Sequence, residues 1–178
     1  MKKILIAVVL LFSAISLNAQ ERWSVGLRVG SAFQADAQMH FNKQYLEARL
    51  GLGYINRFVE EWDADCIGCP PARDYNTFLS ADFSLFYNWK VYHWSSNVGR
   101  VFVDAGVGVN IGGYSQVMYL GPAGMAKVGI KFDSVPIALS LDWSPAFGAS
   151  IPYGYPAGVP AFNSMGLANF GVTCVYNF

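Results

Sequence analysis

The segment Cys66-Ile67-Gly68-Cys69 is the sharpest candidate for chemistry in this sequence. A C-x-x-C pair can form a redox centre, half of a metal site or a disulfide. A thioredoxin-type redox centre needs a βαβ context, which the sequence lacks, and a zinc site needs two further ligands, but no second C-x-x-C follows. In an exported chain, Cys66 and Cys69 are therefore expected to form a local disulfide that closes a loop.

Four acidic residues precede this pair, at Glu60, Glu61, Asp63 and Asp65. Clustered carboxylates can bind hard cations such as calcium, but this spacing matches no defined calcium loop. A solvated acidic loop is the better interpretation. No Gly-rich phosphate loop lies between a strand and a helix. We therefore expect no bound metal and no cofactor.

Elsewhere in the sequence, apolar residues alternate with polar or small ones. In residues 100–112, one face of an extended chain carries only aliphatic side chains, from Val101 to Ile111, and the other carries charge, amide and glycine, with Phe102 as the exception. Such period-2 alternation predicts a β-strand between two different environments. Its length is close to the ~9–11 residues with which a tilted strand crosses a bilayer.

The same pattern predicts eight strands. They cover residues 23–29, 33–41, 46–54, 77–89, 100–112, 126–132, 137–143 and 167–178. The connections between them are 30–32, 42–44, 57–74, 90–99, 113–122, 133–136 and 145–165. Apart from the first connection and 90–99, long loops alternate with short turns, which is the layout of an outer-membrane barrel.

The composition favours an exported membrane protein. Lys2 and Lys3, an apolar run and small residues ending at Ala19 resemble a cleaved signal peptide over residues 1–19, which leaves 20–178 as one domain. Only 13% of the residues are charged and 53% are hydrophobic, yet no later apolar run is long enough for a spanning helix. The predicted fold is all-β, a closed antiparallel up-and-down transmembrane barrel. The balance of charges is near neutral and gives no reason to expect a nucleic-acid partner.

The polar face is expected to line the lumen, because it is mostly Gly, Ser, Ala and Asn and would solvate a soluble exterior poorly. An eight-stranded barrel is just wide enough for side chains to fill. Buried charges of both signs can pair across it, so we expect a plugged lumen. The predicted lumen charges are Arg28, Asp36, Glu47, Arg49, Asp82, Arg100, Asp104, Lys127, Lys131 and Asp142.

Aromatic residues cluster near the predicted strand ends, as in interfacial girdles: Trp23, Tyr54, Tyr75, Tyr87, Trp89, Trp143 and Tyr176. The terminal segment from Val175 to Phe178 resembles the signal that the barrel assembly machinery recognises, with Tyr176 and Phe178 as its aromatic residues. With segments 26–30 and 136–145 and the junction 17–20, the chain resembles small outer-membrane β-barrels of Bacteroidota, which are OmpA/OmpX-like eight-stranded barrels. The resemblance implies the fold and a place in the outer membrane, but no defined activity.

No catalytic residues are expected. Serine-dependent barrel enzymes need a histidine with a serine or an acid at the extracellular rim, whereas His40 and His93 are both predicted at the periplasmic end.

The expected role is structural, or surface contact with an extracellular partner through loops 57–74, 113–122 and 145–165, the last with Tyr153, Tyr155 and Phe162. Two alternatives remain: passage or binding of a small apolar solute, and a soluble secreted ligand-binding barrel. Cys174 is expected on the lipid face, as a small apolar residue.

Overall fold

The computed structural model describes residues 23–61, 72–115, 117–152, 161–164 and 167–178, with side chains left undescribed at 55–61, 72–76 and 161–164. The expected signal segment 1–19 lies outside the described residues. The strands are β1 (Trp23–Gly30), β2 (Ala32–Phe41), β3 (Gln44–Glu61), β4 (Ala72–Ser95), β5 (Gly99–Tyr114), β6 (Val117–Phe132), β7 (Ile137–Trp143), β8 (Phe147–Pro152), β9 (Ala161–Ser164) and β10 (Phe170–Asn177).

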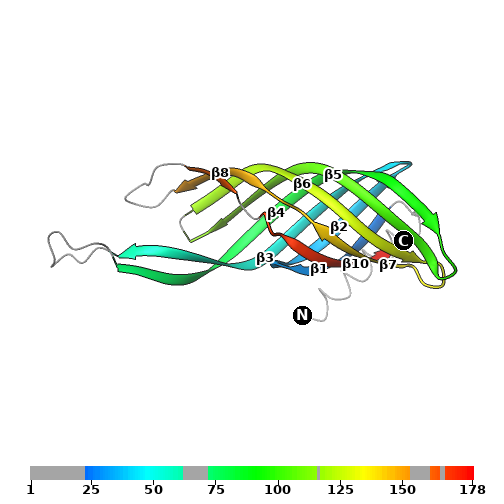
Figure 1. Cartoon of the computed structure of the whole chain (residues 1–178), viewed down its shortest axis with the longest axis horizontal. Helices are drawn as coiled ribbons and strands as arrows, with labels where there is room; N and C mark the ends of the chain where they lie inside the picture. The colour runs from blue at the N-terminus through cyan, green and yellow to red at the C-terminus, as the bar shows by residue number, and fades with distance from the viewer. Residues whose placement is uncertain (1–22, 62–71, 116, 153–160, 165–166) are drawn as a thin grey trace, which may run out of the picture.

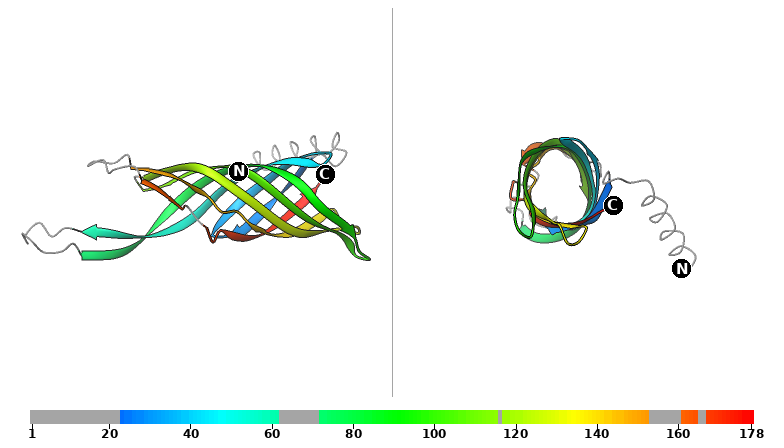
Figure 2. Two further views of the ribbon diagram at one scale, coloured as in Figure 1. Left: turned by 45° about the horizontal axis from the view of Figure 1, so that its top comes forward. Right: turned by 90° about the vertical axis from the view of Figure 1, so that its right-hand side faces the viewer.

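Eight of these strands form a closed antiparallel barrel. Each of β1 to β7 pairs with its neighbour in sequence, and β10 pairs with both β7 and β1 to close the ring. Viewed along its axis, the barrel is a continuous ring of strands (Figure 2). The predicted all-β fold with an eight-stranded up-and-down barrel is confirmed. None of the described segments contains a helix long and apolar enough to cross a membrane.

The barrel has two different ends. At the turn end lie the C-terminus and the short connections β2–β3, β4–β5 and β6–β7 (Figure 1). We call the opposite end, where β1 meets β2 at Ser31, the loop end. There β3 and β4 extend beyond their barrel neighbours: pairing with β2 stops at Gly53 and pairing with β5 stops at Ser80. The two strands continue as a paired arm as far as Glu61 and Ala72.

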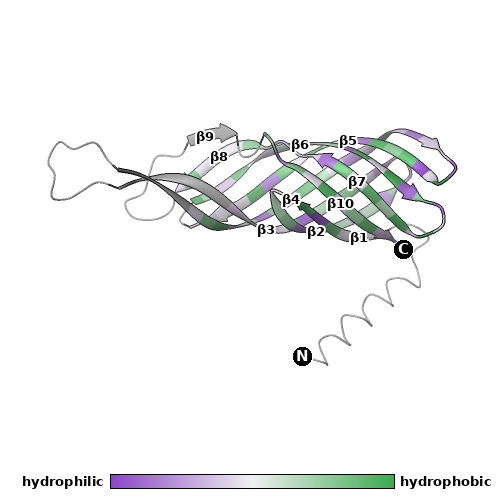
Figure 3. Ribbon diagram, turned by 60° about the horizontal axis from the view of Figure 1, so that its bottom comes forward, coloured by the Kyte–Doolittle hydropathy of each residue, from purple (hydrophilic) through white to green (hydrophobic). Residues whose placement is uncertain are grey.

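The alternation places apolar side chains outside and polar ones inside. Leu50 is 65% exposed and Phe170 is 62% exposed, whereas Arg28 and Glu47 are each 0% exposed. Coloured by hydropathy, the strands show polar and apolar residues in alternation (Figure 3). A soluble globular protein has the opposite arrangement, because its large apolar residues are mostly inside. The turn at Ser31 also divides residues 23–41 into two strands, as predicted.

Several predicted connections are too long. Instead of ending at Trp89, β4 continues to Ser95, so the expected 90–99 connection is only a short turn at 96–98. The cause is a β-bulge between Lys90 and Tyr92, which breaks the alternation. This correction makes all three turn-end connections short.

The predicted loop 113–122 is also wrong. Strand β5 runs to Tyr114 and β6 starts at Val117, so only two residues separate the strands, the first of which is Ser115 at a φ of 49°. Met118 and Leu120 face outwards in phase with the rest of β6. Glycines and Pro122 had obscured this continuation, because both are usually depleted in strands.

The predicted loop 145–165 contains β8 and β9. Pro145 interrupts the strand after β7, and β8 then continues alongside β6 from Val117 to Leu120. Gly124 N donates a hydrogen bond to Pro145 O across the break. Strand β10 begins at Phe170 rather than at Leu167, and the predicted loop 57–74 shortens because β3 ends at Glu61 and β4 begins at Ala72.

Candidate functional site

Charged side chains from five strands meet in the middle of the barrel. Three basic and three acidic side chains are buried there: Arg28, Arg49, Lys127, Asp36, Glu47 and Asp142. We call these six residues the central plug. Because the strands are antiparallel and the barrel is narrow, residues far apart in sequence can pair across the lumen.

Arg49 lies at the centre of the plug. Its guanidinium donates to Glu47 Oε1 at 2.7 Å from Nε, to Asp142 Oδ1 at 3.2 Å from Nη1 and to Asp36 Oδ2 at 3.3 Å from Nε. The same group lies 5.4 Å from the centre of the Phe86 ring, on β4. Arg49 therefore links carboxylates of β2, β3 and β7 in one network.

Glu47 accepts hydrogen bonds on both of its carboxylate oxygens. Its Oε2 accepts hydrogen bonds from Lys127 Nζ at 2.7 Å and from Asn88 Nδ2 at 2.9 Å, while Oε1 faces Arg49. The carboxylate thus has donors on both oxygens. This matters because a buried ion that lacks partners costs several kcal/mol.

Arg28 joins β1 to the far end of the chain. Its Nε donates to Asp142 Oδ1 at 2.7 Å, and its Nη2 donates to Asn169 Oδ1 at 3.1 Å. Thr173 Oγ1 donates to the other oxygen of Asp142 at 2.7 Å. Gly171 gives the guanidinium its space, because a Cβ there would lie 2.5 Å from Arg28 Cζ.

The other four predicted lumen charges lie outside the plug. Asp82 is half-buried towards the loop end and accepts a hydrogen bond from Gln34 Nε2 at 2.6 Å. Asp104 is buried towards the turn end. Arg100 is exposed and lies directly opposite half-buried Lys131 on the β5–β6 ladder, so it lies at the turn-end rim of the lumen and not within the plug. Arg100 is the second residue of β5 and so lies closer to the turn end than the acidic residues of the plug.

A cavity of about 410 Å³ opens at the turn end, beyond the plug. We call it the turn-end cavity. Its lining residues are His40, Asn42, Tyr45, Lys90, His93, Trp94, Ser95, Arg100, Phe102, Asp104, Lys131, Ala138 and Asn177. The sequence alone does not predict this site, because the alternation breaks in segment 90–99, which supplies several of these residues and is predicted to be a connection.

The bulge in β4 brings His93 into this cavity. Val91 and Tyr92 are both exposed, so the inward phase resumes at His93, which pairs with Phe102 of β5. His93 Nε2 lies 3.3 Å from Asp104 Oδ1, and Tyr45 donates a hydrogen bond to Asp104 Oδ2 at 3.0 Å. The signal available in the sequence was the adjacent apolar pair Val91-Tyr92, which breaks the alternation.

A serine and a histidine meet at the same end. Ser24 Oγ lies 2.8 Å from His40 Nε2 and donates a hydrogen bond to Asn177 Oδ1 at 2.8 Å. A catalytic pair needs an accessible nucleophile and a group that orients the base. Ser24 is fully buried, and His40 Nδ1 has no hydrogen-bond partner among the described residues. This geometry supports a structural contact between β1, β2 and β10.

A smaller cavity of about 230 Å³ lies on the loop-end side of the plug. Its lining carries hydroxyl and amide groups together with Asp82, and includes Ser80, Ser84, Asn110 and Tyr119. It shares no lining residue with the turn-end cavity. The plug and its neighbours therefore separate two polar chambers.

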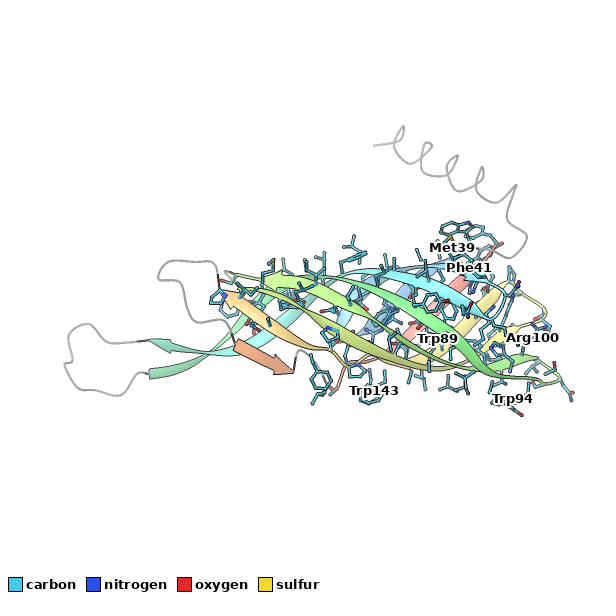
Figure 4. All side chains as sticks on the ribbon, turned by 90° about the horizontal axis from the view of Figure 1, so that it is seen from above. Met39, Phe41, Trp89, Trp94, Arg100 and Trp143 are labelled. Carbon is cyan, nitrogen blue, oxygen red and sulfur yellow. The ribbon has the colours of Figure 1, made fainter. Side chains whose placement is uncertain are left out.

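Large aromatic residues lie on the outer surface. Phe41, Trp89 and Trp94 project outwards towards the turn end, and Trp143 projects outwards nearer the loop end (Figure 4). The side chain of Tyr75 is not described.

Tyr176 and Phe178, the predicted assembly signal, lie together at the turn end. Their rings meet edge to face with centroids 5.1 Å apart. Tyr176 is exposed on the outer face, and Phe178 N donates a hydrogen bond to Trp23 O at 2.9 Å. The terminal residues are therefore part of the seam between β1 and β10.

The predicted disulfide between Cys66 and Cys69 lies outside the described residues, as do Tyr153, Tyr155 and the side chains of the acidic loop and of Phe162. Cys174 is a free cysteine exposed on the outer face. In the described parts of the chain, no group of three or more His, Cys, Asp or Glu side chains could hold a metal ion.

Comparison with known proteins identified no relative: no family model, no curated protein and no solved structure matches this chain.

Proposed function

We propose that this protein is an outer-membrane β-barrel with a side-chain-filled lumen, of the small type found in Bacteroidota, exported through the periplasm. The observation that carries the proposal is the inverted distribution of polarity. Fully buried Arg28 and Arg49 lie inside a barrel whose outer surface exposes Leu50, Leu141 and Phe170. In water that surface would be strongly unfavourable, but it suits contact with lipid tails.

The proposed topology has the turn end in the periplasm and the loop end outside the cell. Short periplasmic turns and longer extracellular connections are the rule in such barrels. The arm formed by β3 and β4 would then project from the cell surface (Figure 1). The proposed role is structural, or contact with an extracellular partner through the arm and the β8–β9 hairpin, without catalysis.

Cell fractionation tests the location, and gel mobility tests the barrel. The protein should sediment with outer membranes, and the unboiled sample should migrate differently from the boiled one, because a folded barrel resists detergent. A soluble secreted ligand-binding barrel is the alternative. It would stay in solution without detergent, and that result would refute the proposal.

Conductance in a planar bilayer tests the closed lumen. The wild-type barrel should show no steady conductance, because the plug separates the two chambers. A triple variant in which Glu47, Arg49 and Lys127 are replaced by alanine is the positive control and should conduct if it inserts. Steady conductance by the folded wild type would contradict a closed lumen and favour passage of a solute.

A further inference from the structure

The turn-end cavity holds more cations than anions. Lys90, Arg100 and Lys131 line it, and Asp104 is the one carboxylate among the described lining residues. That carboxylate is already close to two groups, the Tyr45 hydroxyl at 3.0 Å and His93 Nε2 at 3.3 Å. Basic side chains therefore outnumber acidic ones in the described lining of the cavity.

Two of these cations are direct neighbours. Arg100 and Lys131 are cross-strand partners in the β5–β6 ladder, and both line the cavity. Like charges placed directly opposite each other destabilise a strand pair. An anion at this place could contact both side chains, and the guanidinium fork of Arg100 suits a carboxylate or a phosphate.

The rest of the wall is flat and aromatic. His93 stacks on Phe102 with ring centroids 6.1 Å apart and an interplanar angle of 27°, and Tyr45 also lines the cavity. The stack depends on the β4 bulge, which turns His93 inwards. Bulges are common next to functional sites because they redirect side chains.

We propose that the turn-end cavity binds a small organic anion, with a carboxylate or phosphate group on a planar apolar body. Arg100 and Lys131 contact the anionic group, and the stack of His93 on Phe102 contacts the body. The volume of about 410 Å³ lies within the ~300–1,000 Å³ that is typical of small-molecule sites. The proposal needs only the barrel fold and does not depend on membrane location.

Calorimetric titration of the barrel refolded in non-ionic detergent tests this site. The probes are phenyl phosphate and benzoate, with inorganic phosphate and benzyl alcohol as fragments that lack either the body or the charge. Phenyl phosphate or benzoate should bind at one saturable site. Each fragment should bind at least tenfold more weakly.

Variants locate the binding. Arg100→Gln combined with Lys131→Gln should weaken phenyl phosphate binding at least tenfold. Lys43→Gln removes an exposed cation from the β2–β3 turn at the same end, outside the cavity lining, and should leave binding within twofold. Heat-dependent gel mobility confirms folding, and Arg100→Gln alone, at an exposed position, replaces the double variant if that variant does not fold.

Three results would overturn the proposal. The first is an absence of saturable binding at millimolar phenyl phosphate and benzoate. The second is binding that persists unchanged when Arg100 and Lys131 are both replaced. The third is binding of benzyl alcohol or of inorganic phosphate as tight as that of phenyl phosphate. Such a result would show that the basic pair or the aromatic stack, respectively, contributes nothing to binding.

Discussion

Glu47→Gln is the most informative single substitution, because it removes one charge from the plug with almost no change in shape. Glu47 is 0% exposed and contacts Arg49, Lys127 and Asn88. The glutamine amide keeps one acceptor oxygen, but its NH₂ group would face the donors of either Arg49 or the pair Lys127 and Asn88. Two buried cations then lose their shared counterion.

The size of the effect follows from this geometry. Removing one partner from a buried ion pair costs about 3–5 kcal/mol, because the other charge stays buried without compensation. With 1.4 kcal/mol for each factor of ten, the ratio of folded to unfolded protein should fall by roughly a hundredfold to a few thousandfold. Asp36 and Asp142 remain close to Arg49, so the loss falls mainly on Lys127.

The assay is equilibrium urea unfolding of the barrel in lipid vesicles, followed by tryptophan fluorescence and gel mobility. Asp133→Asn is the matched control: it removes an acid at an exposed turn and should change the free energy of unfolding by no more than ~0.5 kcal/mol. Combining Glu47→Gln with Lys127→Met should cost less than the sum of the two single changes, because the unpaired cation is gone.

Two results together would refute the reasoning. One is a Glu47→Gln barrel within 1 kcal/mol of wild type in its free energy of unfolding. The other is strict additivity with Lys127→Met. Such a barrel would contain enough water for the two groups to be solvated separately, and the plug would not be a dry ion-pair network.

Three further predictions concern the outer face, the packing and the C-terminus. Leu50→Arg places a charge on the proposed lipid face and should destabilise the barrel in vesicles by about 2–4 kcal/mol, measured by urea unfolding; a neutral effect would argue against lipid contact. Gly106→Ala should cost about 1–3 kcal/mol, because the added Cβ would clash with Asn88 Oδ1, whereas Gly124→Ala, whose nearest contact is 3.5 Å away, should be nearly neutral; equal thermal stabilities would contradict this. Phe178→Ala should lower the yield of folded barrel in cells while leaving refolding of the purified chain unchanged, and an equal loss in both would indicate a packing role instead of an assembly signal.

The strand phases could be predicted from the sequence, but the strand lengths could not. Alternation in residues 100–112 is enough to predict which side chains of β5 face inwards. The end of β4 is different, because one inserted residue near Val91 reverses the phase. Pro145 likewise interrupts a strand that resumes as β8. A pattern with a fixed period cannot follow a chain through such interruptions.

The charges of the candidate site were predictable as a group, but their partners were not. Arg100 and Asp104 share one face of β5, yet Asp104 is buried and Arg100 is exposed at the rim. Depth depends on the stagger between neighbouring strands, which the sequence of one strand does not contain. For the same reason, the contact between Ser24 and His40 and the cavity at the turn end became visible only once the ladders were in place.

The closing seam has a consequence for how the protein matures. Arg28 on β1 and Asp142 on β7 meet at 2.7 Å only after β10 has docked between their strands. In a bilayer, a sheet in which β10 has not yet paired would leave the charged side chains of the plug in contact with lipid tails and without their ion-pair partners. A partly closed barrel in a bilayer is therefore expected to have the highest free energy among the assembly intermediates. If the protein is a membrane barrel, as proposed above, insertion and closure of the ring should occur together, because closure brings the acidic and basic side chains of the lumen into contact.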